Sequence, residues 1–290
     1  RQLTVRRFSG NDFSGGVLTF IKGLAQKVIL ANCIGAVHTE ILGMTDRGAV
    51  VAWIGAIAYT LQIFNDFAGY SNMAIGLGKM LGFTFPKNFD RPYASTSVTE
   101  FWRRWHISLS TWFKEYLYIP LGGNRKGKFR QVINLLIVWS LTGLWHGEGV
   151  NFLLWGAILG LLIIMEKLWY GKYLQKLPVL GHIYLVILIP LSWVVFAITD
   201  PGQLGTYFCR LFPLMGNGGV AVNAQDIVKY LQGYGGLLAI GIVLCIPAVF
   251  DFYEKHKKNP VVILMLFVLF WISIYFVSST AGNPFMYLNF

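Results

Sequence analysis

The sequence predicts an all-α membrane protein, a polytopic bundle of transmembrane helices with interfacial and re-entrant helices, and three observations lead to this fold class. Of the 290 residues, 55% are hydrophobic and only 13% are charged, and the mean hydropathy is +0.56. A chain of this length and composition is too apolar for a soluble domain. Long apolar runs recur along it, and lysine and arginine gather in the short loops between those runs.

The apolar runs define the expected spans. Residues 132–145, 151–165, 182–199, 236–250 and 261–277 approach or reach the ~20 apolar residues that cross a bilayer as a helix. Two weaker runs, 28–44 and 48–64, are interrupted by polar residues that buried spans of a bundle tolerate. We therefore expect about seven spans in all.

Two segments do not fit simple spans. In residues 64–83, four glycines lie among apolar residues beside Asp66 and Tyr70, which predicts a broken or re-entrant helix buried by protein. In residues 99–123, tryptophans and other apolar residues recur every three to four positions opposite basic and polar residues. That pattern predicts one amphipathic helix lying in the membrane interface, which Pro120 and the glycines after it end.

The positive charge indicates the topology. The chain holds 24 lysines and arginines against 13 aspartates and glutamates. Such an excess can indicate nucleic-acid binding, but here the positive residues lie in short loops, as on the cytoplasmic side of membrane proteins. Residues 87–130 are rich in them and residues 200–235 are nearly neutral. We therefore predict 87–130 inside, 200–235 outside and no nucleic-acid partner.

The chain reads as one membrane-embedded domain, 1–290. It begins RQLTV, without methionine or a signal-peptide pattern, so we expect it to be the C-terminal portion of a longer protein. Three isolated cysteines, Cys33, Cys209 and Cys245, give neither a disulfide framework nor a CxxC metal site, and we predict no metal.

His146 is the first candidate for chemistry. It stands in GLWHG, about 24 Å along a helix from Arg130 at ~1.5 Å per residue, deep in a ~30 Å hydrocarbon core. Gly143 and Gly147 leave room for a helix or a substrate to approach the imidazole. A histidine at such depth is either a hydrogen-bonded helix end or a functional group, and this placement favours function.

His106 is the second candidate. On the expected helix 99–123 it lies on the apolar side, about 40° from Trp102. A histidine there serves structure or function. We expect Asp66 and Asp90 each to be a helix cap or the partner of a nearby arginine rather than a catalytic group.

Other chemistries lack a signal. The sequence contains no GxSxG, HExxH, CxxC or GxxxxGK[ST] motif. A histidine without a paired nucleophile can still act as a general base on a substrate hydroxyl, which indicates direct group transfer.

Residues 64–127 and 143–147 closely resemble the membrane-bound O-acyltransferase family, in particular its bacterial branch of alginate O-acetyltransferase membrane subunits. The resemblance covers most of the chain, from GLAQKVILAN at 23–32 to the NPFMYLNF end. It implies that His146 matches the family's intramembrane catalytic histidine, that His106 matches a second one, and that several N-terminal spans are missing. Asn72 stands where the DFxGYSD pattern has aspartate, so we assign it no charge-based role.

The resemblance also implies an activity. We expect transfer of an acyl group, acetyl foremost, from a cytoplasmic thioester such as acetyl-CoA to a cell-envelope polysaccharide at the bacterial inner membrane, with no bound cofactor and with a periplasmic SGNH-type acetyltransferase as partner. We expect His146 and His106 to be catalytic, although His146 could also carry the acyl group transiently. Five further residues of the two motifs are expected to bind substrate: Trp145, Asp66, Tyr70, Trp102 and Arg103.

Two other readings stay open. Intramembrane histidines beside glycine-broken helices also occur in transporters and channels, although carboxylates for ion coupling and a repeat are missing here. Alternatively, the chain relays acyl groups to the periplasmic partner, which then performs the final step.

Overall fold

The computed structural model describes residues 8–44, 47–212 and 224–279, and within these ranges the chain forms helices and no strand. Five helical segments are long and apolar enough to cross a membrane, or six if one bent pair is a single span: Gly10–Gly43, Ala49–Met80, Val150–Lys176, Pro178–Ala197, Pro260–Ser279 and the pair 225–243 with Pro247–His256. The chain is therefore a multi-pass helical membrane bundle, as predicted, with somewhat fewer clear spans than we expected.

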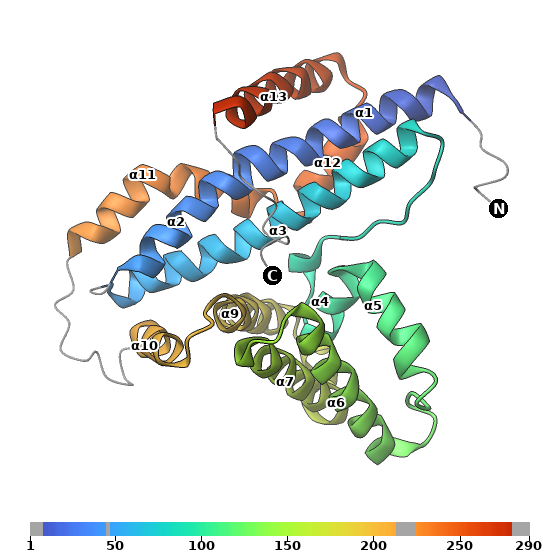
Figure 1. Cartoon of the computed structure of the whole chain (residues 1–290), viewed down its shortest axis with the longest axis vertical. Coiled ribbons are helices and arrows are strands. Elements are labelled where there is room, and N and C mark those ends of the chain that lie inside the picture. Colours follow the sequence, from blue (N-terminus) through green and yellow to red (C-terminus); the bar gives the residue numbers. More distant parts are fainter. Residues whose placement is uncertain (1–7, 45–46, 213–223, 280–290) are drawn as a thin grey trace.

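A long antiparallel pair runs across the molecule (Figure 1). Its first arm is α1 (Gly10–Ala25), continued by the π-helical turn η1 (Gln26–Ala31) and α2 (Asn32–Gly43), and its second arm is α3 (Ala49–Met80). The two arms touch where glycines face each other. A Cβ on Gly76 would lie 2.7 Å from the carbonyl oxygen of Gly16, and a Cβ on Gly69 would lie 2.7 Å from that of Gly23.

The prediction of a broken helix at 64–83 is wrong, because α3 is continuous to Met80. Gly69 and Gly76 serve close helix packing instead, which is the common use of small residues between membrane helices. The bend occurs elsewhere. α11 (Ala224–Val243) and α12 (Pro247–His256) meet at 72°, within the run 236–250 that we expected to cross as one helix.

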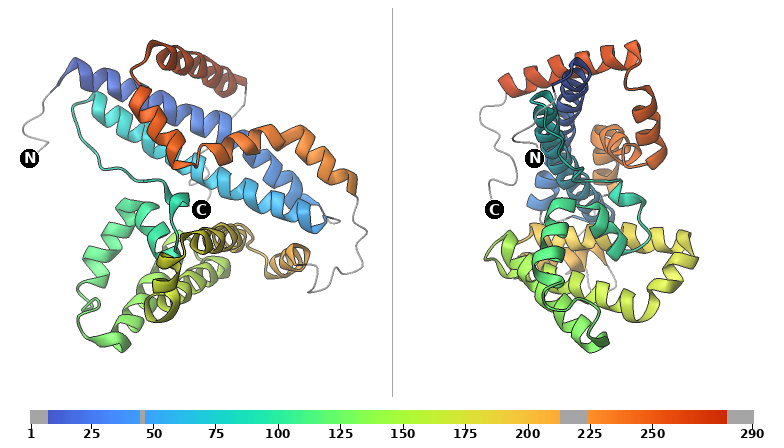
Figure 2. Two further views of the ribbon diagram at one scale, coloured as in Figure 1. Left: turned by 180° about the vertical axis from the view of Figure 1, so that it is seen from behind. Right: turned by 90° about the vertical axis from the view of Figure 1, so that its right-hand side faces the viewer.

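The remaining helices lie on two sides of the central pair, as the views from behind and from the side also show (Figure 2). On one side lie α11, α12 and α13 (Pro260–Ser279). On the other lies the part that forms the site: α4 (Val98–Arg104), α5 (Ile107–Phe113), the π-turn η3 (Lys114–Tyr118), α6 (Gly127–His146), α7 (Val150–Met165) and α9 (Pro178–Ala197). Short elements link them: η2 (Pro92–Ala94), η4 (Glu166–Tyr170), α8 (Gly171–Lys176) and α10 (Pro201–Leu211).

The segment 99–123 is not one helix. It divides into α4, α5 and η3, and the chain turns between the first two at Trp105 and His106, where His106 has φ +45° and ψ +55°. Trp102 and Trp105 are buried, whereas Trp112 and Tyr116 are exposed, so the apolar stripe that the sequence predicts faces different surroundings on the two sides of the break.

α4 is held in place from another helix. Glu166, at the end of α7, accepts hydrogen bonds from the backbone N–H groups of Val98 (2.7 Å) and Thr99 (2.8 Å). A buried carboxylate at a helix N-terminus satisfies otherwise unpaired donors and interacts favourably with the helix dipole. This contact fixes the start of α4 against α7 and so positions the residues that follow it.

Candidate active site

His146 lies at the tip of the hairpin that α6 and α7 form. It is the last residue of α6, and Gly147 ends the helix with φ +156°, a conformation that side chains rarely adopt. A Cβ on Gly147 would lie 2.6 Å from the ring of Phe152, and a Cβ on Gly143 would lie 2.5 Å from the Phe152 carbonyl oxygen. The room that we predicted beside these glycines, for a helix or a substrate, is therefore taken up by a helix, α7.

Aromatic rings surround the His146 imidazole. The rings of Trp155 and Phe196 stand nearly perpendicular to it, with centroids 5.1 and 5.2 Å away, and His146 is only 9% exposed. These rings come from α7 and α9, so three helices fix one side chain. A side chain held in this way has little freedom to change its rotamer, which is what a preorganised proton acceptor requires.

His106 reaches the same place from the break between α4 and α5. Its ring packs at right angles on Phe67 of α3, with centroids 4.6 Å apart, and lies near the indole of Trp145. Histidine is one of the residues that enter the left-handed region more readily, and strained backbone of this kind gathers at functional sites. The sequence predicted the side chain as a candidate but placed it on an uninterrupted helix.

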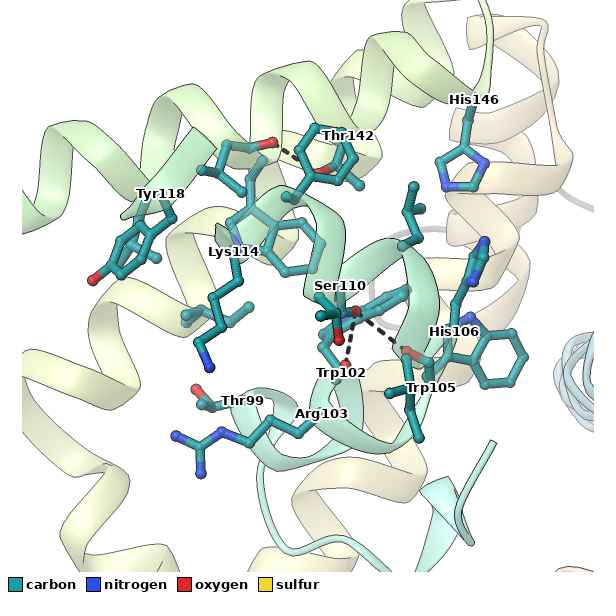
Figure 3. A pocket seen from close by; sticks show the side chains of 18 of the residues that line it. Thr99, Trp102, Arg103, Trp105, His106, Ser110, Lys114, Tyr118, Thr142 and His146 are labelled. Atoms are coloured by element: carbon teal, nitrogen blue, oxygen red, sulfur yellow. Dashed lines mark hydrogen bonds between the residues drawn. The ribbon is translucent and has the colours of Figure 1, made fainter. Parts of the chain in front are cut away.

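Both histidines line one cavity of about 380 Å³ between α4, α5, α6 and α9. Figure 3 shows their imidazoles directed toward each other at one end of it. Burial holds the pKa of the His106 imidazole below its ordinary value, so this ring is neutral and can accept a proton near neutral pH. A cavity with two converging imidazoles is suited to proton transfer.

The middle of the cavity is apolar. Its walls there are mainly tryptophan and aliphatic side chains: Trp102, Trp105, Trp139, Trp193, Leu135 and Ile163. Trp102 lies centrally among the indoles, with its ring centroid 5.2 Å from that of Trp139 and 6.0 Å from that of Trp193. About three turns of α6, from Leu135 to His146, run along this wall, a rise of about 16 Å.

The end opposite the histidines is cationic. Arg103, Lys114 and Lys167 line it, and Figure 3 shows Arg103 and Lys114 there beside Thr99. Within the described ranges, none of the three forms an ion pair with a carboxylate; Glu166, next to Lys167, instead binds the N-terminus of α4. Lys167 lies close enough to Arg103 for the two charges to interact. Positive charges gathered at one end of a cavity favour an anion there.

The other residues that we predicted to bind substrate divide into two groups. Trp102 and Arg103 line the cavity, and Trp145, although half-exposed, has its ring centroid 5.0 Å from that of His146 and 6.1 Å from that of His106. Asp66 and Tyr70 lie on α3 and are not among the lining residues. Asp66 is buried and forms an ion pair with Lys27, so its partner is a lysine and not the arginine that we expected.

Sequence reasoning missed several lining residues. Lys114 and Lys167 stood among the basic residues that mark the cytoplasmic side, and nothing in their local sequence separates them from the others. Trp139 and Trp193 stood inside apolar runs, where an indole is unremarkable. Their grouping depends on how α6 and α9 pack, which only the structure provides. In the part of the chain that the structure describes, no three histidine, cysteine, aspartate or glutamate side chains are grouped to hold a metal ion.

Comparison with known proteins finds one family model and several relatives that match the chain. Residues 41–201 match the model of the MBOAT, membrane-bound O-acyltransferase family. The chain is 34% identical to the probable alginate O-acetylase AlgI of Pseudomonas putida, over all of the chain and 64% of that protein. It is 43% identical to the protein of the same name in Pseudomonas syringae pv. tomato, over 89% of the chain and 50% of that protein.

A third relative acts on another polymer. The peptidoglycan O-acetyltransferase of Helicobacter pylori is 29% identical over 95% of the chain and 56% of that protein. The chain thus spans between half and two thirds of the length of these relatives. The family match covers more than half of the chain and includes His106 and His146, so the chain belongs to the membrane-bound O-acyltransferase family.

Proposed function

We propose that this chain is the catalytic part of a membrane O-acyltransferase that moves an acyl group, acetyl foremost, from a cytoplasmic thioester to a hydroxyl of a cell-envelope polysaccharide. One observation carries the proposal most: His146 and His106 meet at one end of a cavity whose other end is cationic. The cavity has a volume of about 380 Å³ and is lined between its two ends by apolar side chains, which suits an acyl chain.

In the reaction, neutral His146 accepts the proton of the acceptor hydroxyl as its oxygen attacks the acyl carbonyl carbon. The carbon–sulfur bond then breaks, and the thiolate leaves and takes up the proton from His146. One C–O bond forms and one C–S bond breaks, so no oxidant or reductant is needed. His146 suits this role because three helices hold it and little water reaches it.

The cationic end supports the orientation of the donor. Coenzyme A and phosphopantetheine thioesters carry phosphate at the end of a long arm remote from the sulfur. Arg103, Lys114 and Lys167 lack carboxylate partners among the described residues and can bind phosphate. Arg103 and Lys114 also lie in the segment 87–130 that the charge pattern predicts to be cytoplasmic.

The finer parts of the proposal come from the relatives and the resemblance. The names of the Pseudomonas and Helicobacter proteins support alginate or another envelope polysaccharide as acceptor. We further propose that the protein resides in the bacterial inner membrane, binds no cofactor other than the donor thioester, and cooperates with a periplasmic SGNH-type acetyltransferase. We also propose that Asp66 and Tyr70 bind substrate. Because they lie on α3 and do not line the cavity, they would contact the acceptor outside it.

The direct test reconstitutes the purified full-length protein in vesicles with acetyl-labelled acetyl-CoA and alginate. We expect label to appear covalently on the polysaccharide. Label that reaches the polysaccharide only when the periplasmic partner is added would favour the acyl relay. Uptake of a labelled solute with no acyl transfer, with or without the partner, would contradict the proposal and favour a transporter.

A further inference from the structure

Asn88, in the loop after α3, lies against the break that carries His106. Its carbonyl oxygen accepts a hydrogen bond from the N–H of Ile107 (2.9 Å), and two residues later the N–H of Asp90 donates to the carbonyl oxygen of Arg104 (2.9 Å). These two bonds clamp the loop to the residues on both sides of His106. They place the Asn88 side chain beside the imidazole.

The side-chain amide of Asn88 has a defined orientation. Its Oδ1 lies 3.2 Å from the backbone N of Ser108, and a backbone N–H can only donate, so the atom facing it is the oxygen. The Ser108 hydroxyl donates to the same oxygen at 2.9 Å, and the amide nitrogen donates to Ser71 Oγ on α3 at 3.0 Å. The Ser108 N–H therefore determines the orientation, and the two serine hydroxyls are compatible with it.

This orientation determines which nitrogen of His106 carries hydrogen. His106 Nδ1 lies 3.2 Å from Asn88 Oδ1 and 3.3 Å from Ser108 Oγ, whose own hydrogen is used on Asn88. Both neighbours are oxygens with free lone pairs, so Nδ1 must be the donor. In a neutral imidazole, Nε2 is then the unprotonated nitrogen.

We propose that Asn88 is a positioning residue, which holds His106 as the Nδ1–H tautomer so that Nε2 presents its lone pair to the His146 imidazole across the end of the cavity. Nε2 is on the far side of the ring from Nδ1, and Figure 3 shows the His106 ring directed toward His146. This inference deepens the proposed function and rests on it for its consequence in catalysis, although the tautomer itself does not.

The proposal connects three side chains in a row: Asn88, His106 and His146. With this tautomer, Nε2 of His106 is available to accept the N–H of the His146 ring during the reaction, and the other nitrogen of His146 then takes the proton of the acceptor hydroxyl. When His146 becomes positively charged, the same lone pair stabilises it. In the opposite tautomer, His106 would present N–H to the imidazolium and oppose proton transfer, so tautomer control has a direct effect on rate.

The tautomer can be measured without any activity. In the full-length protein labelled with ¹⁵N-histidine, the nitrogen shifts separate a protonated from an unprotonated ring nitrogen, and the His106→Asn variant identifies the signal. We expect Nδ1 protonated and Nε2 unprotonated at neutral pH. Proton on Nε2, whether in the other neutral tautomer or in the imidazolium, would overturn the proposal.

Substitutions at Asn88 test whether this residue determines the tautomer of His106. Asn88→Asp keeps an acceptor oxygen and should keep the tautomer, whereas Asn88→Ala should let the other tautomer appear and lower the transfer rate by about 10-fold to 100-fold, less than removal of the base itself. Asn72→Ala is the control, because Asn72 hydrogen-bonds Gln26 on η1, away from the cavity. If Asn88→Ala folds and leaves both tautomer and rate unchanged, Asn88 does not position His106.

The two proposals fail separately. A wild-type protein with the expected tautomer and no acyl transfer would contradict the proposed function alone. A wild-type protein that transfers acyl groups and has hydrogen on Nε2 would contradict the role of Asn88 alone. If Asn88→Ala does not fold, the wild-type spectrum and the Asn88→Asp variant still decide the question.

Discussion

At the residue scale, the cavity combines two kinds of group that do different work. His146 is buried and His106 is partly buried, while Arg103 and Lys114 are exposed at the opposite end. Exposed cations contribute binding that salt screens, and buried aromatic surroundings keep an imidazole neutral and fixed. The cationic end therefore governs how tightly the donor binds, and the histidine end governs how fast it reacts.

This division predicts the kinetics of variants at the cationic end. Arg103→Gln or Lys114→Gln should raise the KM for acetyl-CoA by about 10-fold, the size of one lost hydrogen bond between charged groups, and leave kcat nearly unchanged. The effect should shrink as ionic strength rises. Lys172→Gln serves as control, since Lys172 lies over the ring of Tyr173, away from the cavity. Equal KM values for acetyl-CoA in all three variants would show that the donor does not bind at the cationic end.

How far the sequence predicts the site depends on the residue. His146 and His106 could be selected because a histidine in an apolar segment is costly and both stand in family motifs. Arg103 and Trp102 could be selected because they stand in the same family motif as His106. Asn88 could not be selected, because its role arises from a loop that returns to a break in another segment. Asp66 was selected as part of the family motif, and the structure pairs it with Lys27.

At the element scale, the structural role of the glycines was the feature that the sequence could not predict. Glycines within an apolar segment predict either a break or close packing, and local sequence does not distinguish them. Gly69 and Gly76 pack against α1, whereas Gly82, with φ +79°, follows the helix end. The break in 99–123 was missed for a related reason: the clamp that stabilises His106 in a left-handed conformation comes from residues 88–90.

The packing of α1 on α3 can be tested at one position. A Cβ on Gly76 would lie 2.7 Å from both the Gly16 carbonyl oxygen and the Phe20 backbone nitrogen, so Gly76→Ala should force the two helices apart. We expect a loss of about 1–3 kcal/mol, read as a lower melting temperature in detergent. The control is Gly205→Ala on α10, where a Cβ meets no atom within 4 Å. A Gly76→Ala protein as stable as Gly205→Ala would contradict this account of the pair.

At the scale of the whole molecule, the topology decides whether donor and acceptor can reach one cavity from two sides of the membrane. Between Lys126 and Gln203 lie α6, the segment Val150–Lys176 and α9. If all three cross, the two residues lie on opposite sides, as the lysine and arginine distribution predicts. α6 is the member that the labelling experiment tests, since it is not among the five clearest spans of the described residues.

Single cysteines at these two positions, in a background without Cys33, Cys209 and Cys245, test this topology. An impermeant maleimide applied to intact cells should label position 203 and leave position 126 unlabelled. Equal labelling of both would mean that α6 does not cross, and labelling of position 126 alone would reverse the predicted orientation.

The central claim is that His146 is the proton acceptor of an acyl transfer, and one rate comparison tests it most directly. Glutamine keeps roughly the size and hydrogen bonding of histidine but cannot accept a proton near neutral pH. His146→Gln in the full-length protein should therefore lose about 10²–10⁴-fold in the rate of acetyl transfer to polysaccharide, with unchanged melting temperature. The matched control is His182→Gln, because His182 binds the Ser95 carbonyl outside the cavity and should keep its rate. Nearly full transfer by a folded His146→Gln protein would mean that His146 is structural.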